Sequence, residues 1–129
     1  MISHAAKCPP LSLSLDGIGC FPDCHKPRVI WLGVSGTTAA LGRLQENIER
    51  DLEQSAFPVE RRPFHAHATL GRIKNFHPAQ KQALSSPVIF SPTQARRMDR
   101  IVLFESRLNP QGCIYDIIEA FELSGREAA

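Results

Sequence analysis

The sequence predicts an α+β fold, a mainly antiparallel sheet with helices packed outside it, and three observations support this prediction. Several short segments alternate apolar and polar residues, as strands do. One central segment has the period of an amphipathic helix. The strand-like segments follow one another without a long helix between each pair, which favours antiparallel pairing over a parallel sheet.

The first half of the chain contains two predicted strands and the main helix. Residues 11–19 begin with alternating leucine and serine, and Asp16 and Gly17 are expected to end that strand. After a loop at residues 20–27, residues 28–34 are rich in β-branched and aromatic side chains and predict a central strand. A helix is predicted within residues 35–57, because one apolar face is formed by Leu41, Leu44, Ile48 and Leu52. Thr37 or Thr38 can cap its start, and Pro58 closes it.

The second half is predicted to be mostly strand. Residues 66–73 form a strand, and residues 77–87 form a short helix at most. A long strand at 96–108, a turn at 109–112 and a strand at 113–123 make a hairpin. Residues 124–129 are expected to fray.

Length and composition limit the classes of protein that this chain can represent. Its 129 residues suit a single domain spanning residues 1–129. No apolar run is long enough to cross a bilayer, and no signal peptide is recognisable. A net charge of +2 argues against nucleic-acid binding by the whole surface, although arginines cluster near residues 61–72 and 96–100. We therefore expect a cytoplasmic protein without a membrane partner.

The cysteines and most histidines are assigned no chemistry at this point. Cys20 and Cys24 have C-x3-C spacing, but no second pair lies at zinc-finger distance. Reduced thiols in a cytosolic loop, with no metal and no cofactor, are the preferred interpretation. The isolated His4, His25 and His77 are interpreted as surface residues in loops.

The segment "HAHATLGR" at residues 65–72 carries the candidate chemistry. Residues two apart in a strand share a face, so His65, His67 and Thr69 point the same way, opposite to the alanines between them. An imidazole, with a pKa of about 6.5, can exchange a proton near neutral pH, and a threonine hydroxyl can donate to a phosphate oxygen. An arginine can bind the same phosphate through two hydrogen bonds. The same alternation also occurs on ordinary exposed strands that have no function.

Arg72 does not fit simple alternation, because it would fall on the face of Leu70. A bend near Gly71 would turn Arg72 toward the histidine face, since glycine accepts the backbone angles of a bulge. We therefore predict an irregularity at this position.

Three segments together resemble the RNA 2′,3′-cyclic phosphodiesterases, or 2′-5′ RNA ligases, of the 2H phosphoesterase superfamily. One is "PFHAHATLGR", which is similar to the family signature P-F-x-P-H-x-T-L-G-R with Ala66 in place of a proline. The second is the hairpin segment, which matches the family at Phe104, Ser106, Gly112 and Tyr115. The third is "GIGCFPDCHKPRVIWLGV". The resemblance extends from about Leu11 to Leu123.

This resemblance implies a two-lobed fold around a cleft and metal-independent hydrolysis of RNA 2′,3′-cyclic ends to 2′-phosphates, with reversible 2′-5′ ligation as a further activity. It implies that His67 is the acid or base, that Thr69 and Arg72 hold the phosphate, and that His65 lines the cleft. RNA ends or cyclic nucleotides would be the partners. No cofactor or metal is implied.

One expected element of the family is missing from the sequence. The first H-x-T motif should precede residue 11, but His4 is followed by two alanines, so the fold is expected to be incomplete at its N-terminus. Two copies forming a homodimer could each supply a His67 motif to a shared cleft. The alternative function is a non-catalytic remnant that binds RNA or nucleotide phosphates through Thr69 and Arg72. A structural or regulatory protein that uses its exposed sheet is a third interpretation.

Overall fold

The structure is a computed structural model that describes residues 2–75, 77 and 91–126. The chain divides into two compact units, each described here by itself. The sheet unit comprises residues 12–38 and 64–96, and the hairpin unit comprises residues 1–11, 39–63 and 97–129. Apart from residue 77, the short helix predicted at 77–87 lies outside the described residues.

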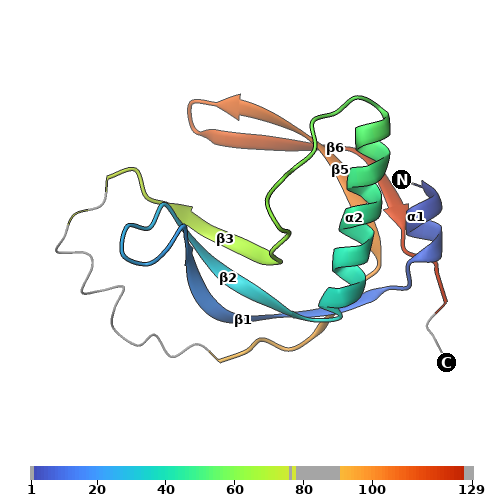
Figure 1. The fold of residues 1–129 in the computed structure, drawn as a ribbon, viewed down its shortest axis with the longest axis horizontal. Coiled ribbons are helices and arrows are strands. Elements are labelled where there is room, and N and C mark those ends of the chain that lie inside the picture. The colour runs from blue at the N-terminus through green and yellow to red at the C-terminus, as the bar shows by residue number, and fades with distance from the viewer. Residues whose placement is uncertain (1, 76, 78–90, 127–129) are drawn as a thin grey trace. The chain divides into compact units, whose positions relative to one another are not determined.

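The sheet unit holds most of a four-stranded sheet with the order β3-β2-β1-β4. Figure 1 labels β3, β2 and β1 in this sheet. Its strands are β1 (Leu11–Phe21), β2 (Val29–Gly36), β3 (His67–Arg72) and the short β4 (Arg96–Met98). β1 pairs antiparallel with β2, and β2 pairs antiparallel with β3. Thr93 also joins β1, since its N–H donates to the Leu15 carbonyl and its hydroxyl accepts from the Leu15 N–H. The predicted antiparallel α+β architecture is confirmed.

The expected end of the first strand at Asp16 and Gly17 is wrong, because β1 continues through both residues. Its pairing with β2 becomes irregular between Leu15 and Ile18, and Gly17 has a φ of 76°. A glycine in this left-handed conformation lets the strand absorb extra residues as a bulge instead of ending.

The hairpin unit contains α1 (Ile2–Lys7), α2 (Thr38–Gln54), β5 (Arg100–Asn109) and β6 (Gly112–Glu122). The antiparallel pair β5–β6 closes where Asn109 faces Gly112, as the turn residues predict. The single long strand predicted at 96–108 is divided at Asp99, whose carbonyl accepts the N–H of Leu123. Buried apolar side chains in this unit are Ala5, Leu11, Leu44 and Leu123.

The predicted main helix is confirmed as α2, but its capping differs from expectation. The helix begins at Thr38, and the preceding Thr37 hydroxyl lies 3.0 Å from the Ser12 nitrogen and 3.3 Å from the Ser12 oxygen. The Thr37 side chain therefore ties the start of the helix to β1 and does not cap the helix. No helix in the described ranges is long and apolar enough to cross a membrane.

The helix α1 was not predicted, and its presence corrects the interpretation of His4 as a loop residue. His4 is half-buried in α1, and its Nε2 lies 2.8 Å from a carboxylate oxygen of Asp51 in α2. The N–H groups of Ser124 and Gly125 donate to the carbonyls of Ala5 and Cys8, so the start of the predicted tail lies against α1. Residues 127–129 of that tail lie outside the described residues.

Candidate functional site

The H-x-T segment forms β3, and its pairing with β2 defines which side chains share a face. His67 pairs with Gly33, and Thr69 pairs with Trp31. Directly opposed residues of an antiparallel pair project on the same side of the sheet. The His67 and Thr69 side chains are exposed and share a sheet face with Trp31, which we call the H-x-T face.

Arg72 reaches the same face because β3 contains a bulge. The register shifts between Thr69 and Gly71, which leaves Leu70 without a partner, and Arg72 then pairs with Val29. Val29 and Trp31 are two residues apart in β2 and therefore project on the same side. The predicted bend is confirmed, and the pairing puts Arg72 on the H-x-T face.

The reason given for that bend is only partly correct. The extra residue is Leu70, whose side chain is exposed, and Gly71 is not among the described residues with positive φ. A Cβ added at Gly71 would meet no atom within 4 Å. The bulge therefore does not depend on the conformational freedom of glycine.

An aromatic cluster supports the two histidine rings. The His67 ring meets Phe21 edge-on with centroids 5.0 Å apart, and the His65 ring lies 4.7 Å from the ring of Trp31. Phe21 and Trp31 are themselves 5.1 Å apart. Such edge-to-face contacts hold rings in defined orientations. His65 therefore lies beside His67, with 6.1 Å between their ring centroids.

One hydrogen bond determines how the His67 ring can act. Its Nδ1 lies 2.6 Å from the carbonyl oxygen of His65. Because a carbonyl oxygen can only accept, Nδ1 carries the proton in the neutral ring. The Nε2 atom then has its lone pair available, which is the state that a general base needs.

Phe21 and Trp31 were not identified as part of the site from the sequence. Trp31 pairs with Gly19 of β1, and its indole ring packs over that glycine. A Cβ added at Gly19 would overlap the ring. The signal is therefore a glycine opposite a tryptophan on a neighbouring strand. That signal can be recognised only when the pairing register is known.

The remaining polar groups form no metal site in the described part of the chain. No group of three or more His, Cys, Asp or Glu residues could hold a metal ion there. Cys20 and Cys24 form a disulfide, so the expectation of reduced thiols in this loop is wrong for that pair. The Cα atoms lie 5.2 Å apart, well within the distance that a disulfide spans. Cys8 and Cys113 are free.

Comparison with known proteins identifies the family of the chain. A family model described as LigT like Phosphoesterase matches residues 32–115. A Thermotoga maritima protein named RNA 2′,3′-cyclic phosphodiesterase is 32% identical over 117 residues, which are 91% of this chain and 60% of that protein. A Bacillus subtilis protein of the same name is 33% identical over 121 residues, which are 93% of this chain and 63% of that protein.

A solved structure is similar over nearly the whole chain. A crystal structure of a Thermus thermophilus protein has a TM-score of 0.73 and 26% identity, and the match covers 98% of this chain and 67% of the other. The chain covers 60% and 63% of the lengths of the Thermotoga maritima and Bacillus subtilis proteins, which are two of several curated relatives.

Proposed function

Because the chain belongs to the LigT-like phosphoesterase family, we propose that it hydrolyses the 2′,3′-cyclic phosphodiester ends of RNA to 2′-phosphates without a metal. The observation that supports this most directly is the H-x-T face, where His67, Thr69 and Arg72 project together. An imidazole can exchange a proton near neutral pH, and a hydroxyl and a guanidinium can hold a phosphate oxygen.

In the proposed reaction, Nε2 of His67 takes a proton from water while the water oxygen attacks phosphorus. The bond from phosphorus to the 3′ oxygen breaks, that oxygen takes up a proton, and a 2′-phosphate remains. The Thr69 hydroxyl donates to a non-bridging oxygen, and the Arg72 guanidinium balances the charge that develops there. The reverse reaction, with a 5′ hydroxyl as the attacking group, would be 2′-5′ ligation.

The proton for the 3′ oxygen needs a second donor. The sequence contains a single H-x-T motif, and the loss of one proton-transfer group typically costs about 10²- to 10⁴-fold in rate. We propose that a homodimer supplies this group, each copy contributing its own His67 to a shared site.

A second candidate function is supported by the same single motif. A protein that binds RNA or nucleotide phosphates through Thr69 and Arg72, without turnover, needs no second histidine. We infer that either activity takes place in the cytoplasm, where RNA is processed. Fractionation of cells, followed by immunodetection of the chain, tests this location.

Turnover of a 2′,3′-cyclic nucleotide in the presence of EDTA distinguishes the two functions. The proposed enzyme keeps its activity in the chelator and loses about 10²-fold or more in kcat on His67→Ala. The matched control is His25→Ala, which removes an exposed histidine and leaves its backbone N–H bonded to Asp23. A binding protein would show no turnover in the parent, and its phosphate binding would survive His67→Ala but fail in Arg72→Ala. A metal requirement would contradict the mechanism.

A further inference from the structure

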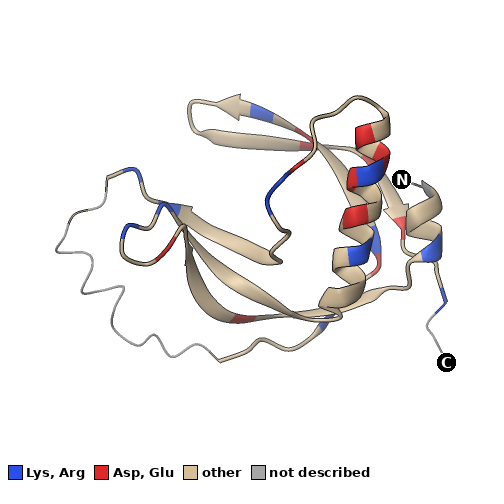
Figure 2. Ribbon diagram, viewed as in Figure 1, with Lys and Arg blue, Asp and Glu red and all other residues tan. Residues whose placement is uncertain are grey.

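A pocket of about 370 Å³ opens in the sheet unit, beyond the H-x-T residues. It is lined by Lys26, Pro27, Arg28, Ile73 and Lys74, and we call it the basic pocket. Three of these five residues are cations. Figure 2 shows blue segments both on the loop between β1 and β2 and just after β3, which are the two parts of the chain that line the pocket.

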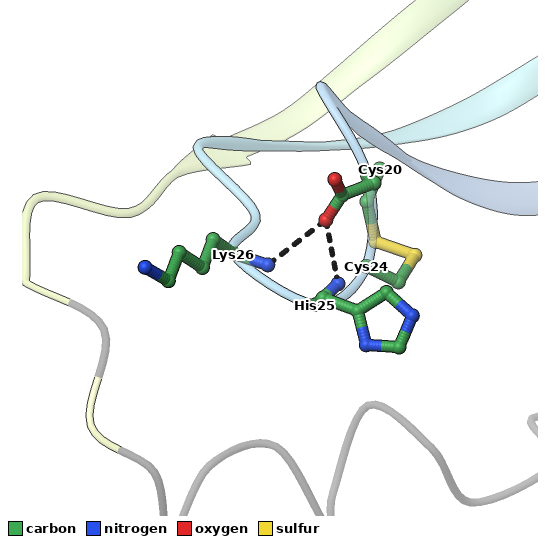
Figure 3. Close-up of a disulfide and its surroundings, with 5 residues drawn as sticks. Cys20, Cys24, His25 and Lys26 are labelled. Carbon is green, nitrogen blue, oxygen red and sulfur yellow. Dashed lines mark hydrogen bonds between the residues drawn. A yellow bond between two sulfur atoms is a disulfide. The ribbon is translucent and has the colours of Figure 1, made fainter.

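The backbone around the basic pocket is held by several interactions. A carboxylate oxygen of Asp23 accepts the N–H groups of His25 and Lys26 at 2.8 and 3.0 Å, and the disulfide Cys20–Cys24 closes the same loop (Figure 3). The N–H of Arg28 donates to the Phe21 carbonyl at 2.8 Å. The N–H of Ile73 donates to the Arg28 carbonyl at 2.9 Å, which joins the two sides of the pocket. The cations are therefore carried on a fixed frame.

The charge of the basic pocket is largely uncompensated. None of the ion pairs found among the described residues involves Lys26, Arg28 or Lys74. Asp23 is the carboxylate that interacts with this loop, and its charge offsets part of that of Lys26, so the three cations leave a net positive charge. A cluster of cations in a concave site concentrates positive potential and favours an anionic ligand.

The distance between the pocket and His67 along the chain restricts which anion the pocket can receive. Arg72 pairs with Val29, and the pocket residue Ile73 follows immediately. Ile73 lies six residues after His67, which corresponds to about 15–20 Å along the strand at ~3.3 Å per residue. The long Arg72 side chain can extend back along the strand toward a phosphate at His67, whereas the basic pocket lies beyond Arg72, where a strand that continues from the reacting end can reach it.

We propose that the basic pocket binds a backbone phosphate of an RNA strand whose cyclic end lies at His67. The location of that end rests on the proposed function. What the pocket adds is a second phosphate site, which favours an oligoribonucleotide over a mononucleotide. Lys26 and Lys74 contribute charge, and the Arg28 guanidinium can bind two phosphate oxygens together.

Two triple variants with equal loss of charge test this proposal. One is Lys26→Ala/Arg28→Ala/Lys74→Ala in the pocket. The control is Lys7→Ala/Arg50→Ala/Arg126→Ala, which removes three exposed cations of the hairpin unit. Fluorescence anisotropy measures the binding of a labelled oligoribonucleotide with a 2′,3′-cyclic end over a range of salt concentrations. A single 2′,3′-cyclic nucleotide is measured in parallel, by calorimetry and by turnover.

The pocket triple variant is expected to weaken oligoribonucleotide binding at least tenfold more than the control triple variant does. It should also reduce the slope of log affinity against log salt by about 0.7, because the pocket is proposed to bind one phosphate and each phosphate contact to a single strand contributes ~0.7. Binding and turnover of the mononucleotide should be the same in both variants. Equal losses of RNA binding in the two triple variants, or no RNA binding by the parent, would overturn the proposal.

The same measurements separate this inference from the proposed function. Pocket-dependent RNA binding without turnover of either substrate would refute the hydrolase and leave the RNA site in place. If the parent and the pocket triple variant turn over the cyclic-ended RNA equally well, the RNA site is refuted and the hydrolase stands.

Discussion

At the scale of residues, alternation along one strand predicted much of the site. The common face of His67 and Thr69 follows from their spacing of two residues. Alternation alone would put Arg72 on the opposite face, and this mismatch predicted the irregularity in β3. Phe21 and Trp31, which pack against the histidine rings, could not be predicted in the same way. Their role depends on the register between β1, β2 and β3, which is a property of residues far apart in the sequence.

The support of the histidine rings can be tested at Gly19. The change Gly19→Ala places a methyl group where the rigid Trp31 indole lies, so the ring or strand β1 must shift. We expect a loss of about 1–3 kcal/mol in the free energy of unfolding, the usual range for overpacking.

Gly42→Ala in α2 is the control, because nothing lies within 4 Å of its new methyl group, and a gain of about 0.5–1 kcal/mol is expected. Urea unfolding of the three proteins is the measurement. Equal stability of Gly19→Ala and the parent would contradict the packing of Trp31 over Gly19.

The loop beside the basic pocket should have a pH-dependent contribution to stability. The backbone N–H groups of Lys26 and His25 lower the pKa of the Asp23 carboxyl in the folded protein. An aspartate with a lowered folded pKa stabilises the fold above its unfolded value of about 3.9, and that contribution disappears as the pH falls through the folded pKa.

The variant Asp23→Asn cannot titrate and should remove this dependence. We expect the parent to be more stable than Asp23→Asn at pH 7 and the difference to shrink below about pH 4. Urea midpoints of both proteins between pH 7 and pH 3 provide the measurement. A difference that stays constant over this range would show that the Asp23 carboxylate is not held as described.

At the scale of elements, the strands and the long helix were predicted because their patterns are local. The helix α1 was not predicted, since a helix of six residues has little stability of its own and depends on contacts such as that between His4 and Asp51. The continuation of β1 through Asp16 and Gly17 also depends on its partner, because the pairing with β2 resumes beyond the irregularity.

The disulfide that closes the β1–β2 loop makes a prediction at this scale. A loop of this size, with a sequence separation of 4 between the cysteines, restricts the unfolded chain by about 2 kcal/mol in the chain-entropy description. Cys20→Ser/Cys24→Ser should therefore unfold about 2 kcal/mol more easily than the oxidised parent.

The control for this variant is Cys113→Ser, which changes an exposed free thiol and should leave the free energy of unfolding unaltered. Addition of a reductant should lower the stability of the parent to that of the double variant. A double variant as stable as the oxidised parent would show that this disulfide does not constrain the loop.

At the scale of the whole molecule, the sequence predicted the α+β class and the family, but not the exposure of the β5–β6 hairpin. Phe104 pairs with Ile117 and Ser106 pairs with Tyr115, so Phe104, Tyr115 and Ile117 share one face of the hairpin. Their exposed fractions are 49%, 63% and 66%. Alternation within each strand identifies this face, but only the arrangement of the other elements determines whether it is covered.

An exposed apolar hairpin face predicts self-association of the chain. Contiguous apolar surface of this kind usually marks an interface, and a two-stranded sheet has little stability without one. We expect the parent to form dimers at micromolar concentration and Ile117→Lys to shift it toward monomers, because burying the new ammonium group in an apolar interface is costly.

Val59→Lys is the control, since it adds the same charge at another exposed apolar residue of the hairpin unit. Sedimentation equilibrium of all three proteins measures the dissociation constants. A parent that stays monomeric, or a dimer that Ile117→Lys leaves intact, would contradict an interface on this face.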